Sequence, residues 1–184
     1  MSGIGLYLNS VVKHITIQNL LLWGLVGLIS GALCFWAVKA GKMKKKSAVL
    51  LVLLILYITF VVTITLLNRT PTKRPRYMLK LFWAYRYIRA GRTTILAEKL
   101  WNVLFFIPVG LMLANLLPRG KYWGSVVLAA ILSAGIELAQ LLSHRGLFEY
   151  DDMLCNTLGA ALGVLWYFLW GKGKRRLADT RKKT

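Results

Sequence analysis

The sequence contains very little cysteine and histidine, the residues that build disulfide scaffolds and most transition-metal sites. Its two cysteines, Cys34 and Cys155, are far apart and give neither a disulfide framework nor a metal-ligand spacing. Cys34 lies inside a long apolar run, where we expect a small buried apolar residue. The two histidines, His14 and His144, are also far apart, and a single histidine at a helix end is more often solvated than catalytic. We therefore expect no metal and no cofactor.

Acidic residues are scarce as well, with six Asp and Glu against 25 Lys and Arg and a net charge of +19. In a soluble protein such an excess would favour nucleic acid as the partner. Here the cations lie next to long apolar runs, where the anionic lipid of a membrane is nearer. We expect membrane lipids, and no nucleic acid, to be the partners of the basic residues.

Long apolar runs are what the sequence has in abundance. Hydrophobic residues make up 57% of the 184, and the mean hydropathy is +0.57. About 20 apolar residues in a helix cross a hydrocarbon core about 30 Å thick, and unbroken runs lack the alternation of barrel strands. The first run is long for a signal peptide and has one basic residue before it, so we take it as a span. We predict an all-α bundle of about five transmembrane helices, at residues 17–38, 48–67, 101–117, 123–142 and 153–170.

The basic residues between the spans predict the orientation. With five spans the two termini lie on opposite sides, and the larger share of the cations falls in loops 39–46 and 119–121 and in the tail from residue 172. The positive-inside rule places this set in the cytoplasm and the N-terminus outside. The margin is narrow because the basic segment, residues 68–99, would then lie outside.

The basic segment carries nine Lys and Arg, one acid and five aromatic rings. Its charges do not keep to one helical face, so the pattern does not support an amphipathic surface helix. It is either an interfacial linker, with rings at headgroup level and cations on lipid phosphates, or a site for a phosphate-rich ligand. Its candidate ligand-binding residues are Arg76, Lys80, Arg86 and Arg89.

Polar residues within the apolar runs form a second group of candidates, because ionisable groups cost a few kcal/mol to place near the middle of a bilayer. Glu137 and Gln140 lie three residues apart in the fourth run, so both project from one helical face. Glu137 could instead reach the outer interface and have a purely structural partner. Asn102 adds a polar side chain to the third run.

Acidic residues precede the fifth run, where they could simply cap its helix and complement the helix dipole. Alternatively, Asp152 meets Glu137 in a polar cluster at the outer membrane surface, with Arg145 or a cation of the basic segment between the two carboxylates. Carboxylates this close can bind Mg²⁺ or Ca²⁺, but the spacing fixes no ligand geometry. The candidate ligand-binding residues of this cluster are Glu137, Gln140, Arg145, Asp151, Asp152 and Asn156.

Two pairs of glycines are spaced for close helix contact. Gly27 and Gly31 lie four residues apart in the first span, and Gly159 and Gly163 do so in the fifth. The spacing is common and specifies no partner. Such small-residue faces could also join copies of the chain in a homo-oligomer.

Three ordered blocks in the C-terminal half carry a resemblance to a known family. They read Asn102-Val-Leu-Phe-Phe-Ile-Pro-Val-Gly110, then Glu137-Leu-Ala-Gln140, then residues 146–163 with the Glu-Tyr-Asp-Asp run inside. This order resembles the VanZ-like family of small bacterial membrane proteins, over roughly residues 68–170. The family usually carries an Asn-Leu-Ile-Pro-Phe type motif between its second and third spans, where this sequence reads Tyr77-Met-Leu-Lys-Leu-Phe-Trp83 without the proline of the motif.

The resemblance implies a four-helix core, a place in the bacterial cell envelope and an association with resistance to the glycopeptide teicoplanin, but no particular reaction. We divide the chain accordingly into an N-terminal segment with the first span (1–47), a VanZ-like membrane domain (48–170) and a basic cytoplasmic tail (171–184).

Three functions stay open. The favoured one is a non-enzymatic envelope protein that binds an anionic lipid or cell-wall precursor through the basic segment and the outer cluster. A lipid or solute transporter would need a polar path, and only Glu137 and Gln140 lie deep, with no inverted repeat. A membrane-embedded phosphotransfer or hydrolytic enzyme would need a nucleophile and a positioned acid or base, and the Pro-Ser-Gly-His type motif of lipid phosphatases is absent.

The predicted orientation can be tested by thiol labelling. We expect an impermeant maleimide to label Ser143→Cys but not Thr184→Cys on intact cells, because residues 143–152 would be extracellular and the tail cytoplasmic. Both variants are made without Cys34 and Cys155, and lysed cells serve as the labelling control. Labelling at position 184 but not at 143 would reverse the orientation.

Overall fold

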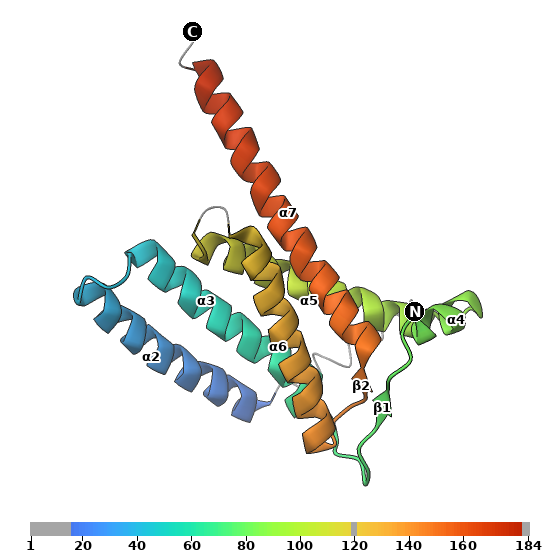
Figure 1. Cartoon of the computed structure of the whole chain (residues 1–184). Coiled ribbons are helices and arrows are strands. Elements are labelled where there is room, and N and C mark those ends of the chain that lie inside the picture. The colour runs from blue at the N-terminus through green and yellow to red at the C-terminus, as the bar shows by residue number, and fades with distance from the viewer. Residues whose placement is uncertain (1–15, 119–120, 182–184) are drawn as a thin grey trace.

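The computed structural model describes residues 16–118 and 121–181, with side chains described up to residue 170. Five long helices make up the bundle in Figure 1, and each is long and apolar enough to cross a membrane. The predicted all-α membrane bundle is thus confirmed. The helices are α2 (Ile17–Lys39), α3 (Lys45–Val62), α5 (Thr93–Leu116), α6 (Tyr122–Ser143) and α7 (Tyr150–Arg181), of which α7 projects beyond the others.

Shorter elements lie at one end of the bundle. A π-helical segment, η1 (Thr63–Leu67), continues α3, and the Asn68 N–H closes it by donating to the Thr63 carbonyl over 2.9 Å. The connector, residues 68–92, then runs to α5 and contains the seven-residue helix α4 (Trp83–Arg89). Its strand β1 (Tyr77–Met78) pairs in parallel with β2 (Phe148–Glu149), so the connector is tied to the α6–α7 loop.

The start of α5 is the main departure from the predicted boundaries. We placed the third span from residue 101, but α5 begins at Thr93 and carries Glu98 and Lys99 inside it. Lys99 is buried, and its charge is matched by two carboxylates described below. A paired lysine does not have to remain in the connector, which is why the helix starts earlier than hydropathy alone indicates.

Helices α5 and α7 pack so closely that three glycines are required between them. A Cβ at Gly159 would lie 2.1 Å from the Val103 carbonyl oxygen, and one at Gly163 would lie 2.1 Å from that of Ile107. From the other side, a Cβ at Gly110 would lie 2.0 Å from the Ala160 carbonyl oxygen. No side chain fits at these distances, so the backbones of the two helices are in direct contact. The predicted contact at Gly159 and Gly163 is confirmed.

Helix α2 lies at the edge of the bundle, alongside α3 (Figure 1). The Trp23 indole N–H donates to the Thr63 hydroxyl over 3.1 Å and fixes α2 against the end of α3. Gly27 faces Leu56 of α3, with 3.4 Å from an added Cβ to the leucine side chain, but a Cβ at Gly31 would meet nothing within 4 Å. The expected close contact at Gly31 is therefore wrong. Cys34 is buried, as expected.

The helices bury a compact apolar centre and turn further apolar side chains outward. Leu54, Val61, Phe106, Ile136 and Ala160 belong to the buried cluster where α3, α5, α6 and α7 meet. Large exposed apolar side chains occur along all five long helices, including Leu28, Val49, Leu104, Ile131 and Trp166. An outer surface of this kind is matched to the acyl chains of a bilayer and not to water.

The contact between α5 and α7 predicts a sharp difference between two glycine substitutions. Gly159→Ala should destabilise the protein by about 1–3 kcal/mol, because its Cβ must displace the backbone of α5, and should lower the Tm by roughly 2–12 °C. Gly135→Ala, where an added Cβ meets nothing within 4 Å, is the matched control and gains the same helix propensity. Thermal unfolding in one detergent measures both. Equal midpoints for the two variants would contradict the close packing.

Candidate functional site

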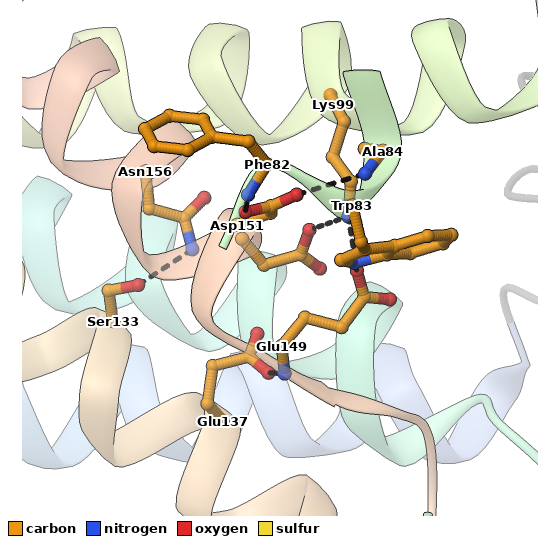
Figure 2. A network of polar contacts seen from close by, with 10 residues as sticks. Phe82, Trp83, Ala84, Lys99, Ser133, Glu137, Glu149, Asp151 and Asn156 are labelled. Atoms are coloured by element: carbon orange, nitrogen blue, oxygen red, sulfur yellow. Dashed lines mark hydrogen bonds and ion pairs between the residues drawn. The ribbon is translucent and has the colours of Figure 1, made fainter. Parts of the chain in front are cut away.

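Polar side chains gather where four helix ends meet beneath the connector. The end of α3 with η1, the start of α5, the end of α6 and the start of α7 lie at the same end of the bundle (Figure 1). The connector and the α6–α7 loop cross this end, held together by the pairing of β1 with β2. Figure 2 shows the polar network, which takes residues from the connector, α5, α6, α7 and β2.

Lys99 of α5 is the cation at the centre of this network. Its Nζ donates to Glu149 Oε2 over 2.5 Å and also pairs with Asp152 Oδ1 at the start of α7. The Trp83 ring lies 5.4 Å from Nζ, and the indole N–H donates to the same Glu149 oxygen over 3.0 Å. An unpaired ammonium here would cost several kcal/mol, so Lys99 requires its two carboxylate partners.

Glu149 is the most heavily engaged carboxylate of the network. Burial and the neighbouring negative charge of Asp152 raise its pKa above the ordinary value of 4.5, although Lys99 and the Trp83 indole act in the opposite direction. The carboxyl therefore holds its proton to higher pH than an exposed glutamate does. When the Glu149 carboxyl is ionised, the ammonium of Lys99 balances its negative charge.

Glu137 of α6 holds the main chain of the α6–α7 loop. Its side chain is only 2% exposed, and Oε2 accepts the Glu149 backbone N–H over 2.9 Å. The loop needs such an anchor because its backbone is turned sharply, with His144 at φ +58° and Gly146 at φ +142°. Glu137 thus lies directly beneath Glu149 and fixes where the acidic run starts.

Gln140, Asn156 and Asn102 line a small polar cavity together with the two acids Glu137 and Asp152. The cavity volume is about 10 Å³, enough for one water-sized particle. Gln140 Nε2 donates to the Thr65 carbonyl of η1 over 3.1 Å, so the π-helical turn supplies an acceptor for α6. The sequence-predicted residues Glu137, Gln140, Asp152, Asn156 and Asn102 are thus brought together.

Asp151 points away from the cavity and caps helix α4. Its two oxygens accept the backbone N–H groups of Phe82, over 2.6 Å, and Ala84, over 3.1 Å. Phe82 has φ +57°, which is unusual for a bulky residue, and Asp151 offsets that strain by binding the first free N–H groups of the helix. We considered capping as a role for the acidic run, but the helix that Asp151 caps is α4 and not its own.

Arg145 does not lie between the carboxylates of Glu137 and Asp152. The prediction that it does so, offered beside a cation of the basic segment, is therefore wrong. Arg145 Nη1 donates to the carbonyl oxygens of Leu67, over 2.7 Å, and Arg69, over 3.0 Å. Leu67 is the last residue of η1 and Arg69 lies just after it, where a helix end leaves backbone oxygens without intrahelical partners, and the guanidinium supplies the missing donor. The cation between acids is Lys99, which belongs to the basic segment as we had defined it.

Arg76, Lys80, Arg86 and Arg89 lie outside the cavity, exposed on the connector. Arg89 lies over the Tyr85 ring at 5.9 Å. The helical part of the connector is confined to the seven residues of α4. The connector cations and the polar cavity are therefore two separate features at the same end of the bundle.

Sequence reasoning missed Lys99 as a site residue and treated Glu149 only as part of a capping run. A signal for Lys99 was present, because it precedes Asn102 by three residues and so shares a helical face with it once the helix is extended backwards. In the residues that the structure describes, no three His, Cys, Asp or Glu side chains are grouped as ligands for a metal ion.

Comparison with known proteins gives one match. A family model described as VanZ/LLP1 matches residues 47–171, from the start of α3 to the end of the membrane-spanning part of α7. No curated protein and no solved structure matches the chain. The matched range contains every residue of the cavity and the whole connector.

The cap on α4 predicts a local effect of Asp151→Ala. Losing an acceptor at a helix N-terminus costs roughly 0.5–2 kcal/mol, so α4 should open about tenfold more often, and trypsin should cleave after Arg86 or Arg89 correspondingly faster. Glu98→Ala, which removes an exposed acid from α5, is the matched control. Cleavage of Asp151→Ala at the wild-type rate, in the same detergent, would show that Asp151 does not hold α4.

Proposed function

The chain belongs to the VanZ/LLP1 family, and from that premise we propose that it is a multi-pass protein of the bacterial cell envelope that binds a phosphate-bearing lipid through its connector. The ligand is an anionic phospholipid or a lipid-linked cell-wall precursor, which share a phosphate group at the membrane surface. The binding residues are the exposed cations Arg74, Arg76, Lys80, Arg86 and Arg89.

The observation that carries this proposal is the separation of the acids from the connector cations. In the described part of the chain, both ion pairs within 4.0 Å are made by Lys99, with Glu149 and Asp152. Asp151 is occupied by two backbone N–H groups. The nearby acids are thus directed inward, and the connector cations stay exposed and uncompensated, as binding to external phosphate requires.

The connector is also held in place before any ligand arrives. Pairing of β1 with β2 ties its middle to the α6–α7 loop, and Asp151 holds the start of α4. Tyr77, Phe82 and Tyr85 are exposed beside the cations. Aromatic rings of this kind lie at headgroup level in membrane proteins, so the connector suits the lipid–water interface. A preformed binding surface loses less entropy when it binds.

The size of the polar cavity favours this function over the other two that the sequence left open. A volume of about 10 Å³ does not accommodate a lipid headgroup or a sugar. Transport or hydrolysis at the cavity would need a larger opening, whereas binding at the exposed connector does not. We further propose that the bound precursor or lipid links the protein to teicoplanin susceptibility.

The proposal predicts a loss of lipid affinity when the connector is neutralised. Each cation near an anionic surface contributes about 1 kcal/mol, so Arg74→Gln, Arg76→Gln, Lys80→Gln and Arg86→Gln together should weaken binding at least tenfold. The purified protein is titrated calorimetrically with short-chain phosphatidylglycerol, with phosphatidylcholine as the neutral comparison. Farnesyl pyrophosphate distinguishes a preference for polyprenyl pyrophosphates from one for phospholipids.

The matched control neutralises four exposed lysines at the other end of the bundle, Lys39, Lys42, Lys44 and Lys121. It should change the affinity by less than about twofold, and wild-type binding should weaken as salt rises. If both quadruple variants bind alike, the connector is not the binding surface. Retained teicoplanin resistance in cells that express only the connector variant would separate that phenotype from lipid binding.

A further inference from the structure

The polar cavity contains two buried oxygen atoms that no hydrogen bond satisfies. Gln140 and Asn156 are 3% and 5% exposed, and each uses its amide nitrogen, towards Thr65 and Ser133 respectively. Among the residues that the structure describes, the amide oxygens Gln140 Oε1 and Asn156 Oδ1 have no partner. Buried polar atoms almost always have partners, so two acceptors lining one cavity indicate a ligand that is positively charged or donates hydrogen bonds.

Two carboxylates line the same cavity. Glu137 uses Oε2 to bind the Glu149 N–H, and Asp152 uses Oδ1 to bind Lys99. These contacts occupy one oxygen of each carboxylate. The cavity wall therefore has oxygen acceptors from both α6 and α7, which is the ligand type that hard cations prefer.

The charged groups at the cavity leave room for one further positive charge. Glu137, Asp152 and Arg69 line the cavity, and Asp152 also pairs with Lys99, which pairs with Glu149. When all three carboxylates are ionised, one negative charge remains, and a buried charge of this kind is offset either by a proton on a carboxylate or by a bound cation. A single monovalent cation provides the balance, whereas a divalent ion would leave an excess of positive charge.

We propose that this cavity is a binding site for one Na⁺ ion, held by Gln140 Oε1, Asn156 Oδ1 and the carboxylates of Glu137 and Asp152. The volume of about 10 Å³ admits a particle the size of a water molecule or a bare ion and excludes an organic ammonium group.

An ion in this position joins parts of the chain that are distant in the sequence. Gln140 comes from the end of α6, and Asp152 and Asn156 come from the first two turns of α7 (Figure 2 for Asn156). The ion thereby stabilises the loop on which Glu149 and the pairing of β2 with β1 depend. The site is independent of lipid binding at the connector, so each can fail without the other.

The site is tested on the purified full-length protein in an uncharged detergent. We expect ²²Na⁺ to bind saturably with one ion per chain, and the unfolding temperature to rise with NaCl when choline chloride keeps the ionic strength constant. Gln140→Leu and Asn156→Leu should each weaken Na⁺ binding at least tenfold, because each removes one oxygen ligand.

A control variant separates ligation from the change of side chain. Asn115→Leu makes the same exchange at an exposed position of α5 that lies outside the cavity. It should bind Na⁺ as the wild type does. Direct ²²Na⁺ binding to the wild type does not depend on any variant folding.

Three results would overturn the proposal. The first is no ²²Na⁺ binding and the same unfolding temperature in NaCl and choline chloride, which would leave the cavity to water. The second is stabilisation by Ca²⁺ or Mg²⁺ without any by Na⁺. The third is folded Gln140→Leu and Asn156→Leu proteins that bind Na⁺ with wild-type affinity.

Discussion

The buried ion pairs of Lys99 are the interaction on which the polar end of the bundle depends. An ammonium in this position is tolerated only when carboxylates surround it, and these come from the loop before α7 and from its first turn. The same Glu149 carboxylate accepts the Trp83 indole N–H, while Glu137 holds the Glu149 main chain. One cation therefore determines how the connector, α5, α6 and α7 meet.

This arrangement separates the charges of the protein into two layers. The acids near the connector are turned inward, towards Lys99 or towards the backbone of α4, and the arginines and lysines of the connector are left outside. In a membrane protein the first layer is stabilised by internal pairing, because the lipid offers no hydrogen bonds. The second layer makes no ion pair with an acid of the chain among the residues that the structure describes, and this is the observation behind the proposed binding of phosphate.

The parts of the structure that follow from local pattern could be predicted, and the parts that follow from long-range pairing could not. Hydropathy located five spans, since a bilayer demands long apolar runs, and helical spacing with a short loop placed Glu137 near Asp152. The start of α5 was placed too late because Lys99 looks like a loop residue until its partners, 50 and 53 positions further on, are known. The capping of α4 by Asp151 likewise links residues 67 and 69 positions apart.

The glycine contacts in the middle of the bundle and the carboxylates at its end belong to one arrangement. Helices α5 and α7 both begin at the polar end, and Gly159 lies against Val103 with no side chain between the backbones. Lys99 precedes Val103 by one turn, and Asp152 precedes Gly159 by two turns. The short side chain of Asp152 reaches Lys99 across this narrow gap, and any residue larger than glycine at position 159 would widen it. The glycines at the helix contact therefore affect the site by keeping α5 and α7 close together. At this separation the short polar side chains of α7 can reach those of α5.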